Sequence, residues 1–186
     1  MEKKVSYVFL APGFEEIEAL TTVDVLRRAG MPVQMVSLTE DNIVPSAHGV
    51  EVASDLNSGD LDFDDLDVEW LICPGGMPGA TNIAESEFAT DWLMSHYEGG
   101  GRVAAICASP AVVLAPLGLL DGKPATCYPG MEYHDCEADW CQDMVVVSGQ
   151  IVTGRGPASA AEFALTLVRE SLGDDVARQV AEGMLL

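Results

Sequence analysis

Residues 102 to 115 read RVAAICASPAVVLA and join an apolar strand to the start of a helix. The run from Arg102 to Ile106 is typical of a buried parallel strand, and the residues after Cys107 have a helical composition. Cys107 therefore falls in a strand-to-helix turn, the position of a nucleophile elbow. There the free N–H groups and the dipole of the helix favour the thiolate. The alternative is a structural cysteine, because cysteine is among the most often buried residues.

Strand-like and helix-like segments alternate along the rest of the chain. Buried strands are predicted at residues 5–11, 33–38, 68–73 and 102–106, and helices at 15–29, 87–97, 157–172 and after Gly173. A hairpin is indicated at 145–153, and a short hairpin or an edge excursion at 43–53. This alternation predicts a mostly parallel sheet with helices on both faces. The length of 186 residues fits one domain that spans residues 1–186.

Acidic residues outnumber basic residues by 30 to 9, which gives the chain a formal net charge of −21. This charge argues against nucleic acid or an anionic membrane surface as a partner. The first apolar segment ends at Pro12, too early for a secretory signal, and no apolar segment is long enough to cross a bilayer. We therefore expect a cytoplasmic protein. Free thiols are expected because the cysteines are odd in number; they are Cys73, Cys107, Cys127, Cys136 and Cys141.

Two groups of possible metal ligands lie outside the elbow. The acidic run 60–67 lacks the spacing and central glycine of an EF-hand, so a solvated connection is favoured over a calcium loop. His134, Cys136 and Cys141 match no familiar zinc spacing and lack a fourth ligand. We therefore expect no metal and no cofactor site.

The carboxyl ends of parallel strands are where ligands bind in sheets of this kind. Gly75 and Gly76 follow the predicted strand 68–73, at the same edge as Cys107. The glycines alone are weak evidence, because strand-to-helix turns use glycine without binding anything. Beside a thiolate, the N–H groups of Gly76 and Ala108 are placed to converge on a developing oxyanion.

Glu18 lies one turn into the first predicted helix. Acidic residues at a helix start interact favourably with the helix dipole, which explains Glu15, Glu16 and Glu18 without any function. Neighbouring apolar residues, however, indicate that part of this helix face is packed. A half-buried carboxyl near a thiolate is pushed toward its protonated form, in which it can hydrogen-bond the sulfur and transfer a proton.

Five segments resemble the signature blocks of the ThiJ/PfpI superfamily, and above all its DJ-1 (parkinsonism-associated deglycase) branch. They are residues 11–18, 23–30, 74–76, 104–110 and 155–157, in the family's order and spacing. The resemblance implies a flavodoxin-like three-layer sandwich with a nucleophile-elbow cysteine at Cys107. It also implies a protonated acid at Glu18, oxyanion donors at Gly76 and Ala108, and a homodimer built around the first helix and residues 43–53, with Arg28 and His48 near the interface.

Departures from the family limit what the resemblance carries over. Superfamily branches with peptidase or chaperone assignments have a histidine directly after the cysteine, where this chain has Ala108, so a Cys-His protease is disfavoured. Tyr128 stands where eukaryotic DJ-1 proteins have a pocket histidine, and tyrosine is no base near neutral pH. Cys127 is either a resolving thiol or a plain strand residue. His48 replaces a basic residue that lines the family's dimer-side pocket.

Two classes of function follow from these residues. The first is an enzyme that acts on a small carbonyl substrate, a glutathione-independent glyoxalase or deglycase with Cys107 as nucleophile and Glu18 as proton shuttle. The second is an oxidative-stress sensor or chaperone-like protein whose Cys107 is oxidised to a sulfinate without turnover. A role in thiazole-phosphate biosynthesis has no support, because the sequence shows neither a phosphate loop nor a basic cluster.

Overall fold

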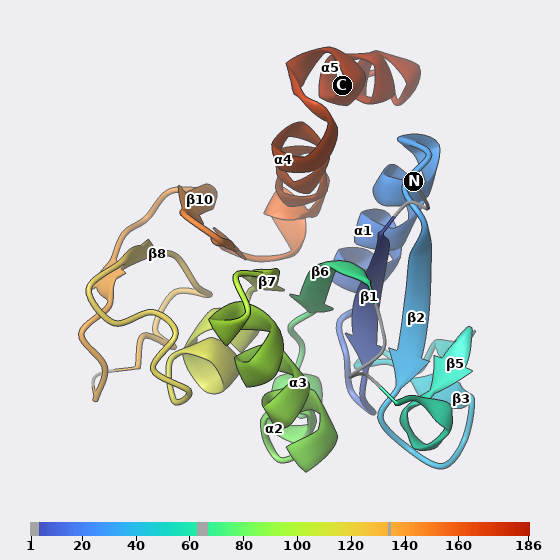
Figure 1. Cartoon of the computed structure of the whole chain (residues 1–186), viewed down its shortest axis with the longest axis vertical. Helices are drawn as coiled ribbons and strands as arrows, with labels where there is room; N and C mark the ends of the chain where they lie inside the picture. Colours follow the sequence, from blue (N-terminus) through green and yellow to red (C-terminus); the bar gives the residue numbers. More distant parts are fainter. Residues whose placement is uncertain (1–3, 63–66, 134) are drawn as a thin grey trace.

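The computed structural model of the chain describes residues 4–62, 67–133 and 135–186. Its centre is a seven-stranded sheet (Figure 1). The strands are β1 (Val5–Leu10), β2 (Val33–Ser37), β5 (Leu56–Asn57), β6 (Val68–Cys73), β7 (Arg102–Ile106), β10 (Val145–Ser148) and β11 (Ile151–Gly154). They lie in the order β10-β11-β7-β6-β1-β2-β5, and every neighbouring pair is parallel except β10 and β11. The predicted mostly parallel sheet is confirmed.

Both faces of the central strands are buried. In β7, Ala104 and Ile106 belong to one core cluster, while Val103 and Ala105 belong to the other. This is the alternation expected of a strand, whose successive side chains point to opposite faces. A strand covered on both faces has no polar side, which is why these segments are continuous apolar runs in the sequence.

Helices form the two outer layers. They are α1 (Glu16–Arg28), α2 (Gly79–Ala84), α3 (Glu87–Glu98), α4 (Ala160–Leu172) and α5 (Asp174–Gly183). Helices α1, α4 and α5 contribute to the first core cluster, whereas α2 and α3 contribute to the second. Figure 1 shows α4 beside α1 and α5 beyond it, toward the C-terminus. The prediction of helices on both faces is therefore confirmed.

Shorter elements complete the chain. Both predicted hairpins are present: β3 (Ile43–Pro45) pairs antiparallel with β4 (Glu51–Ala53), and β10 pairs antiparallel with β11. Two strands were not predicted, β8 (Pro124–Ala125) and β9 (Asp139–Trp140), which pair in parallel. Each has two residues, too few to produce a periodic pattern. Short helical turns occur at η1 (Ser58–Asp60), η3 (Pro110–Leu114) and η4 (Pro157–Ser159).

The segment after Cys107 differs from the prediction. A regular helix was expected from Ala108, but η3 is a π-helical turn of five residues, closed by the Ala115 N–H donating to the Pro110 carbonyl at 2.9 Å. Pro110 has no N–H to donate, and Val112 and Val113 are β-branched residues with lower helix propensity. The six-residue α2 was also not predicted.

Some expectations concern residues outside the described ranges. Residues 63–66 of the acidic run and His134 of the possible zinc cluster fall there. Among the helices of the described ranges, none combines the length and the apolar character needed to cross a membrane.

Candidate active site

Cys107 occupies the turn directly after β7, in an unusual backbone conformation. Its φ is 64°, in the left-handed region that non-glycine residues rarely adopt. Two hydrogen bonds fix it: the Cys107 N–H donates to the Gly154 carbonyl at 2.9 Å, and the Cys107 carbonyl accepts from the Tyr128 N–H at 2.8 Å. Such a conformation costs on the order of 1–3 kcal/mol and persists only where the surroundings impose it. This is the backbone of a nucleophile elbow, as the sequence predicted.

Glu18 brings a carboxyl group to the same edge of the sheet. Its side chain is fully buried on the first turn of α1. The carboxyl Oε2 accepts a hydrogen bond from the Gly75 N–H at 2.8 Å. Oε1 is buried without a nitrogen or oxygen partner among the described residues, and the carboxyl interacts with the Cys107 thiol. Glu15 caps α1 instead: its carboxylate accepts a hydrogen bond from the Glu18 N–H at 2.8 Å.

Gly75 lies between the acid and the thiol and leaves no room for a side chain. A Cβ atom there would lie 2.6 Å from the Cys107 Cβ and 2.7 Å from the Glu18 Oε2. Gly76 has a φ of 86°, and a Cβ on it would lie 2.5 Å from the Gly13 carbonyl oxygen. The glycine pair is therefore needed for close backbone approach, and it sets the contact between Glu18 and Cys107.

Burial governs the ionisation of both groups. It raises the pKa of Glu18 to about 7, against the opposing effect of hydrogen bonds from the Cys107 thiol and the Gly75 N–H. Burial and the negative charge of Glu18 raise the pKa of Cys107 to about 12, while the N–H groups of Gly76 and Ala108 bond the sulfur and lower it. The pair consequently carries one negative charge at most near neutral pH.

This electrostatic environment corrects one expectation. The sequence predicted a thiolate favoured by a helix dipole, but η3 is too short to supply one, and Cys107 is only 7% exposed. With Glu18 ionised, the thiol keeps its proton. A thiolate at Cys107 therefore requires the proton to be on Glu18, and the donors that favour it are the backbone N–H groups of Gly76 and Ala108.

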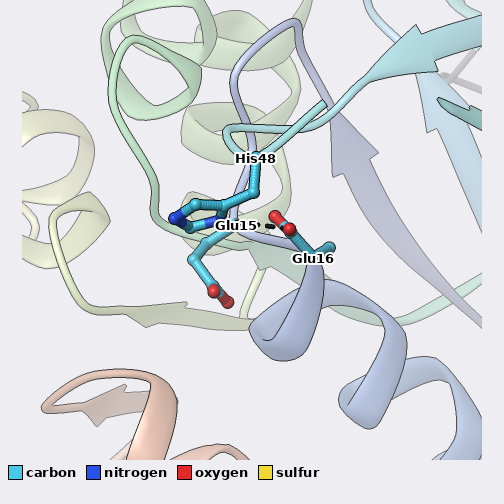
Figure 2. Close-up of side chains that lie close together, drawn as sticks. All are labelled: Glu15, Glu16 and His48. Atoms are coloured by element: carbon cyan, nitrogen blue, oxygen red, sulfur yellow. Dashed lines mark ion pairs between the residues drawn. The ribbon is translucent and has the colours of Figure 1, made fainter. Parts of the chain in front are cut away.

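A second group of side chains lies beside the start of α1. The hairpin of β3 and β4 contacts the loop before α1, where the Ala47 N–H donates to the Phe14 carbonyl at 2.7 Å. The Nδ1 of His48 lies 3.0 Å from the Glu16 Oε1, and this pairing raises the pKa of His48 (Figure 2). Figure 2 shows the Glu15 carboxylate directed away from that ion pair.

One group of side chains within the described ranges has the spacing to accept a metal ion. It consists of Glu15, Glu16 and His48, which each place one ligand atom within 4.8 Å of the others. Neither the sequence nor the family resemblance indicated this grouping. His48 is distant from the other two along the chain, and only the hairpin brings it close.

The remaining predicted residues lie as follows. All five cysteines are free thiols, as expected. Cys127 is buried, its pKa is raised to about 12 by burial, and its thiol donates to the Tyr128 carbonyl at 3.5 Å. Tyr128 is 47% exposed at the edge of the site. Within the described ranges, Cys136 and Cys141 belong to no group of metal ligands. Gly75, which holds the Glu18 carboxyl, was noticed in the sequence only as half of a glycine pair.

Comparison with known proteins agrees with this geometry. A family model described as the DJ-1/PfpI family matches residues 3–170. Protein dj-1beta of Drosophila melanogaster is 38% identical over 185 residues, which cover 98% of this chain and 97% of that protein. A Caenorhabditis elegans protein named glutathione-independent glyoxalase DJR-1.2 is 31% identical over a match that covers 99% of this chain and 97% of the worm protein. The solved structure of oxidized Toxoplasma gondii DJ-1 superposes with a TM-score of 0.91 at 38% identity, covering 98% of each chain. The flavodoxin-like fold is thereby confirmed.

The charge shared by Glu18 and Cys107 leads to a prediction for Glu18→Gln. The amide keeps the shape and a donor N–H but removes the negative charge that raises the pKa of Cys107. We expect the Cys107 pKa to fall by at least about one unit. The ultraviolet absorbance of the thiolate, titrated against pH with Cys107→Ser as the blank in each background, measures it. Equal Cys107 pKa values in the wild type and Glu18→Gln would contradict the coupling.

Proposed function

This chain belongs to the DJ-1/PfpI family, and on that basis we propose that it is a cysteine-dependent enzyme that acts on small reactive carbonyl compounds. The reaction is that of a glutathione-independent glyoxalase, or of a deglycase that acts on the adduct of such a carbonyl compound with an amine or a thiol. The observation that carries the proposal is the buried contact of Cys107 with Glu18 beside Gly75. The name of the worm relative, a glutathione-independent glyoxalase, supports the substrate class.

The first step is addition of sulfur to the carbonyl. Glu18 accepts the thiol proton as the Cys107 Sγ attacks the aldehyde carbon of a 2-oxoaldehyde such as methylglyoxal; a C–S bond forms, and the carbonyl electron pair moves to oxygen. Glu18 then gives that proton to the oxyanion, which yields the hemithioacetal and leaves Glu18 ionised. The N–H groups of Gly76 and Ala108 bond the sulfur in the resting protein, so they lie close to the charge as it moves from sulfur to oxygen. Donors fixed in this way stabilise an oxyanion without reorganising. We assign them that role.

The second step is a proton transfer through Glu18. The carboxylate takes the proton from C1 of the hemithioacetal and returns it to C2, while the hydroxyl proton moves from the oxygen on C1 to the oxygen on C2, which gives a thioester of the 2-hydroxy acid. C1 is oxidised and C2 is reduced, so no external oxidant or reductant is needed. Water then hydrolyses the thioester, and methylglyoxal plus water gives lactate and a proton. A pKa of about 7 suits Glu18 to this task, since a catalytic acid–base group works best near the operating pH.

A second candidate is an oxidative-stress sensor without turnover. The thiolate of Cys107 would react with two equivalents of peroxide to give a sulfinate and two molecules of water. The observation that favours this role is the buried Glu18 carboxyl beside the sulfur, which in its protonated form donates to a sulfinate oxygen. The similar Toxoplasma protein is described as oxidized in its solved structure.

The assembly we propose is a homodimer. Exposed apolar side chains lie on α1 and on the hairpin of β3 and β4: Ile17 (53%), Leu20 (36%), Ile43 (50%) and Val50 (47%). The hairpin contacts the loop before α1, so the two sets are neighbours on the surface. An exposed apolar patch suits a two-fold interface, in which the same surface of each subunit is buried. Arg28 pairs with Asp24 at 2.7 Å toward the other end of α1, and its place near the interface stays a prediction.

Turnover of methylglyoxal tests the proposed enzyme. We expect lactate formation by the wild type, a loss of at least about a hundredfold in Cys107→Ser and in Glu18→Gln, and an unchanged rate in the control Cys141→Ser. Lactate is followed enzymatically after removal of the protein. Equal lactate formation by the wild type and Cys107→Ser would refute the proposal.

Peroxide treatment tests the sensor. Mass spectrometry of the peptide that contains Cys107 is expected to show two added oxygen atoms on that residue in the wild type, and further oxidation in Glu18→Ala, which has lost the donor. If Cys107 stops at the same oxidation state in both proteins, Glu18 does not protect a sulfinate, and this role fails.

Sedimentation equilibrium tests the homodimer. We expect a dimer at micromolar concentration and a monomer for Ile43→Glu, because a two-fold axis would bring two unpaired charges into an apolar interface. The matched control is Val147→Glu on β10, which is 43% exposed and lies at the other edge of the sheet. A monomeric wild type would overturn the assembly.

A further inference from the structure

A hollow of about 220 Å³ is lined by segments that follow β8 and β11, and residues in or next to these segments hydrogen-bond to the backbone of Cys107. Its surface is apolar, and its lining includes Tyr128, Pro129, Met144, Arg155, Pro157 and Ala158. The lining comes from three places: the loop after β8, the residue before β10, and the turn that follows β11.

The backbone of Cys107 bonds directly to two of these segments. The Cys107 carbonyl accepts from the N–H of Tyr128, and the Cys107 N–H donates to the carbonyl of Gly154, the residue before Arg155. A third hydrogen bond, from the Arg155 N–H to the Met144 carbonyl at 2.9 Å, connects the turn after β11 to the residue before β10. The position of the hollow relative to the elbow is therefore fixed by main-chain contacts.

Packing of Tyr128 gives the hollow its aromatic wall. A Cβ atom on Gly156 would lie 3.5 Å from the Tyr128 Cδ2, which places the ring against the Gly156 backbone. The ring is held on one side and remains 47% exposed on the other. Met144 is 41% exposed, and its flexible thioether can adapt to the shape of a ligand.

The size of the hollow suits a small apolar group. An apolar cavity of about 150 Å³ is enough to bind a benzene ring in a protein interior. At about 220 Å³ the hollow can receive an aryl or branched alkyl group even though one side is open to solvent. A methyl group or a hydrogen atom would leave most of it filled with water.

We propose that this hollow binds the apolar substituent of the carbonyl substrate and makes 2-oxoaldehydes with an aryl or branched alkyl group better substrates than methylglyoxal. The inference rests on the proposed enzymatic function and assigns its substrate class. Tyr128 and Met144 are the residues that determine the selectivity. Burial of the substituent lowers the free energy of the transition state relative to the free aldehyde, because apolar surface leaves water as sulfur approaches the carbonyl carbon.

The first measurement compares kcat/KM for phenylglyoxal and methylglyoxal, from initial rates of mandelate and lactate formation. We expect the ratio of the two values to favour phenylglyoxal by about tenfold and to fall several-fold in Met144→Gln, which keeps the length of the side chain but is polar. Val147→Thr is the matched control, since it makes an isosteric polar change on β10 outside the lining and should keep the wild-type ratio.

The second measurement tests binding in the hollow without turnover of a substrate. Cys107 is alkylated with iodoacetamide and with iodoacetanilide, which carry the same reactive group and differ by a phenyl ring, and the rates are normalised to those of N-acetylcysteine. We expect iodoacetanilide to be favoured at Cys107 in the wild type and less so in Met144→Gln.

The outcomes separate the two proposals. Absence of turnover with a preserved alkylation preference would refute the enzyme and support the apolar subsite. Turnover of methylglyoxal with a normalised alkylation ratio near one, or with a phenylglyoxal ratio that Met144→Gln leaves unchanged, would overturn the subsite and leave the enzyme standing.

Discussion

A carboxyl and a thiol share one buried site at the carboxyl edge of the sheet, where water cannot screen a second negative charge. The negative charge of Glu18 makes ionisation of Cys107 more costly, while the Cys107 thiol favours the ionised carboxyl by donating a hydrogen bond to it, so protonation of one is tied to charge on the other. The polar groups that remain to stabilise the single charge are main-chain N–H groups, from Gly75 toward the carboxyl and from Gly76 and Ala108 toward the sulfur. The site therefore depends on backbone geometry more than on charged side chains.

That backbone geometry is strained, and the sheet is what maintains it. Cys107 lies in the left-handed region directly after the fully buried residues Ala104 to Ile106 of β7, which pair with β6 and β11. Gly75 and Gly76 follow β6, so neighbouring parallel strands deliver the thiol and its donors to one place. A strained turn costing on the order of 1–3 kcal/mol persists only on such a rigid support.

Sequence patterns predicted the parts of this structure that local rules determine. Continuous apolar runs located β6 and β7, because a strand buried on both faces has no polar side. The π-helical turn after Cys107 and the six-residue α2 were not predicted, since neither is long enough to show a helical period. The pairing of Glu16 with His48 and the tight approach of Gly75 to Cys107 arise from contacts distant in sequence. Only the folded chain defines them.

In the enzyme that we propose, Tyr128 connects the chemistry of the site to its selectivity. In the reaction that we propose, Tyr128 supplies no imidazole base, so Glu18 moves the proton between C1 and C2 and then assists the attack of water on the thioester. These steps are compatible with one residue, because returning the proton to C2 leaves Glu18 ionised and ready to accept another from water. The Tyr128 ring packs against Gly156 and provides an apolar wall of the hollow. In that proposal, the tyrosine that stands in place of the family's pocket histidine also provides a surface for an apolar substituent.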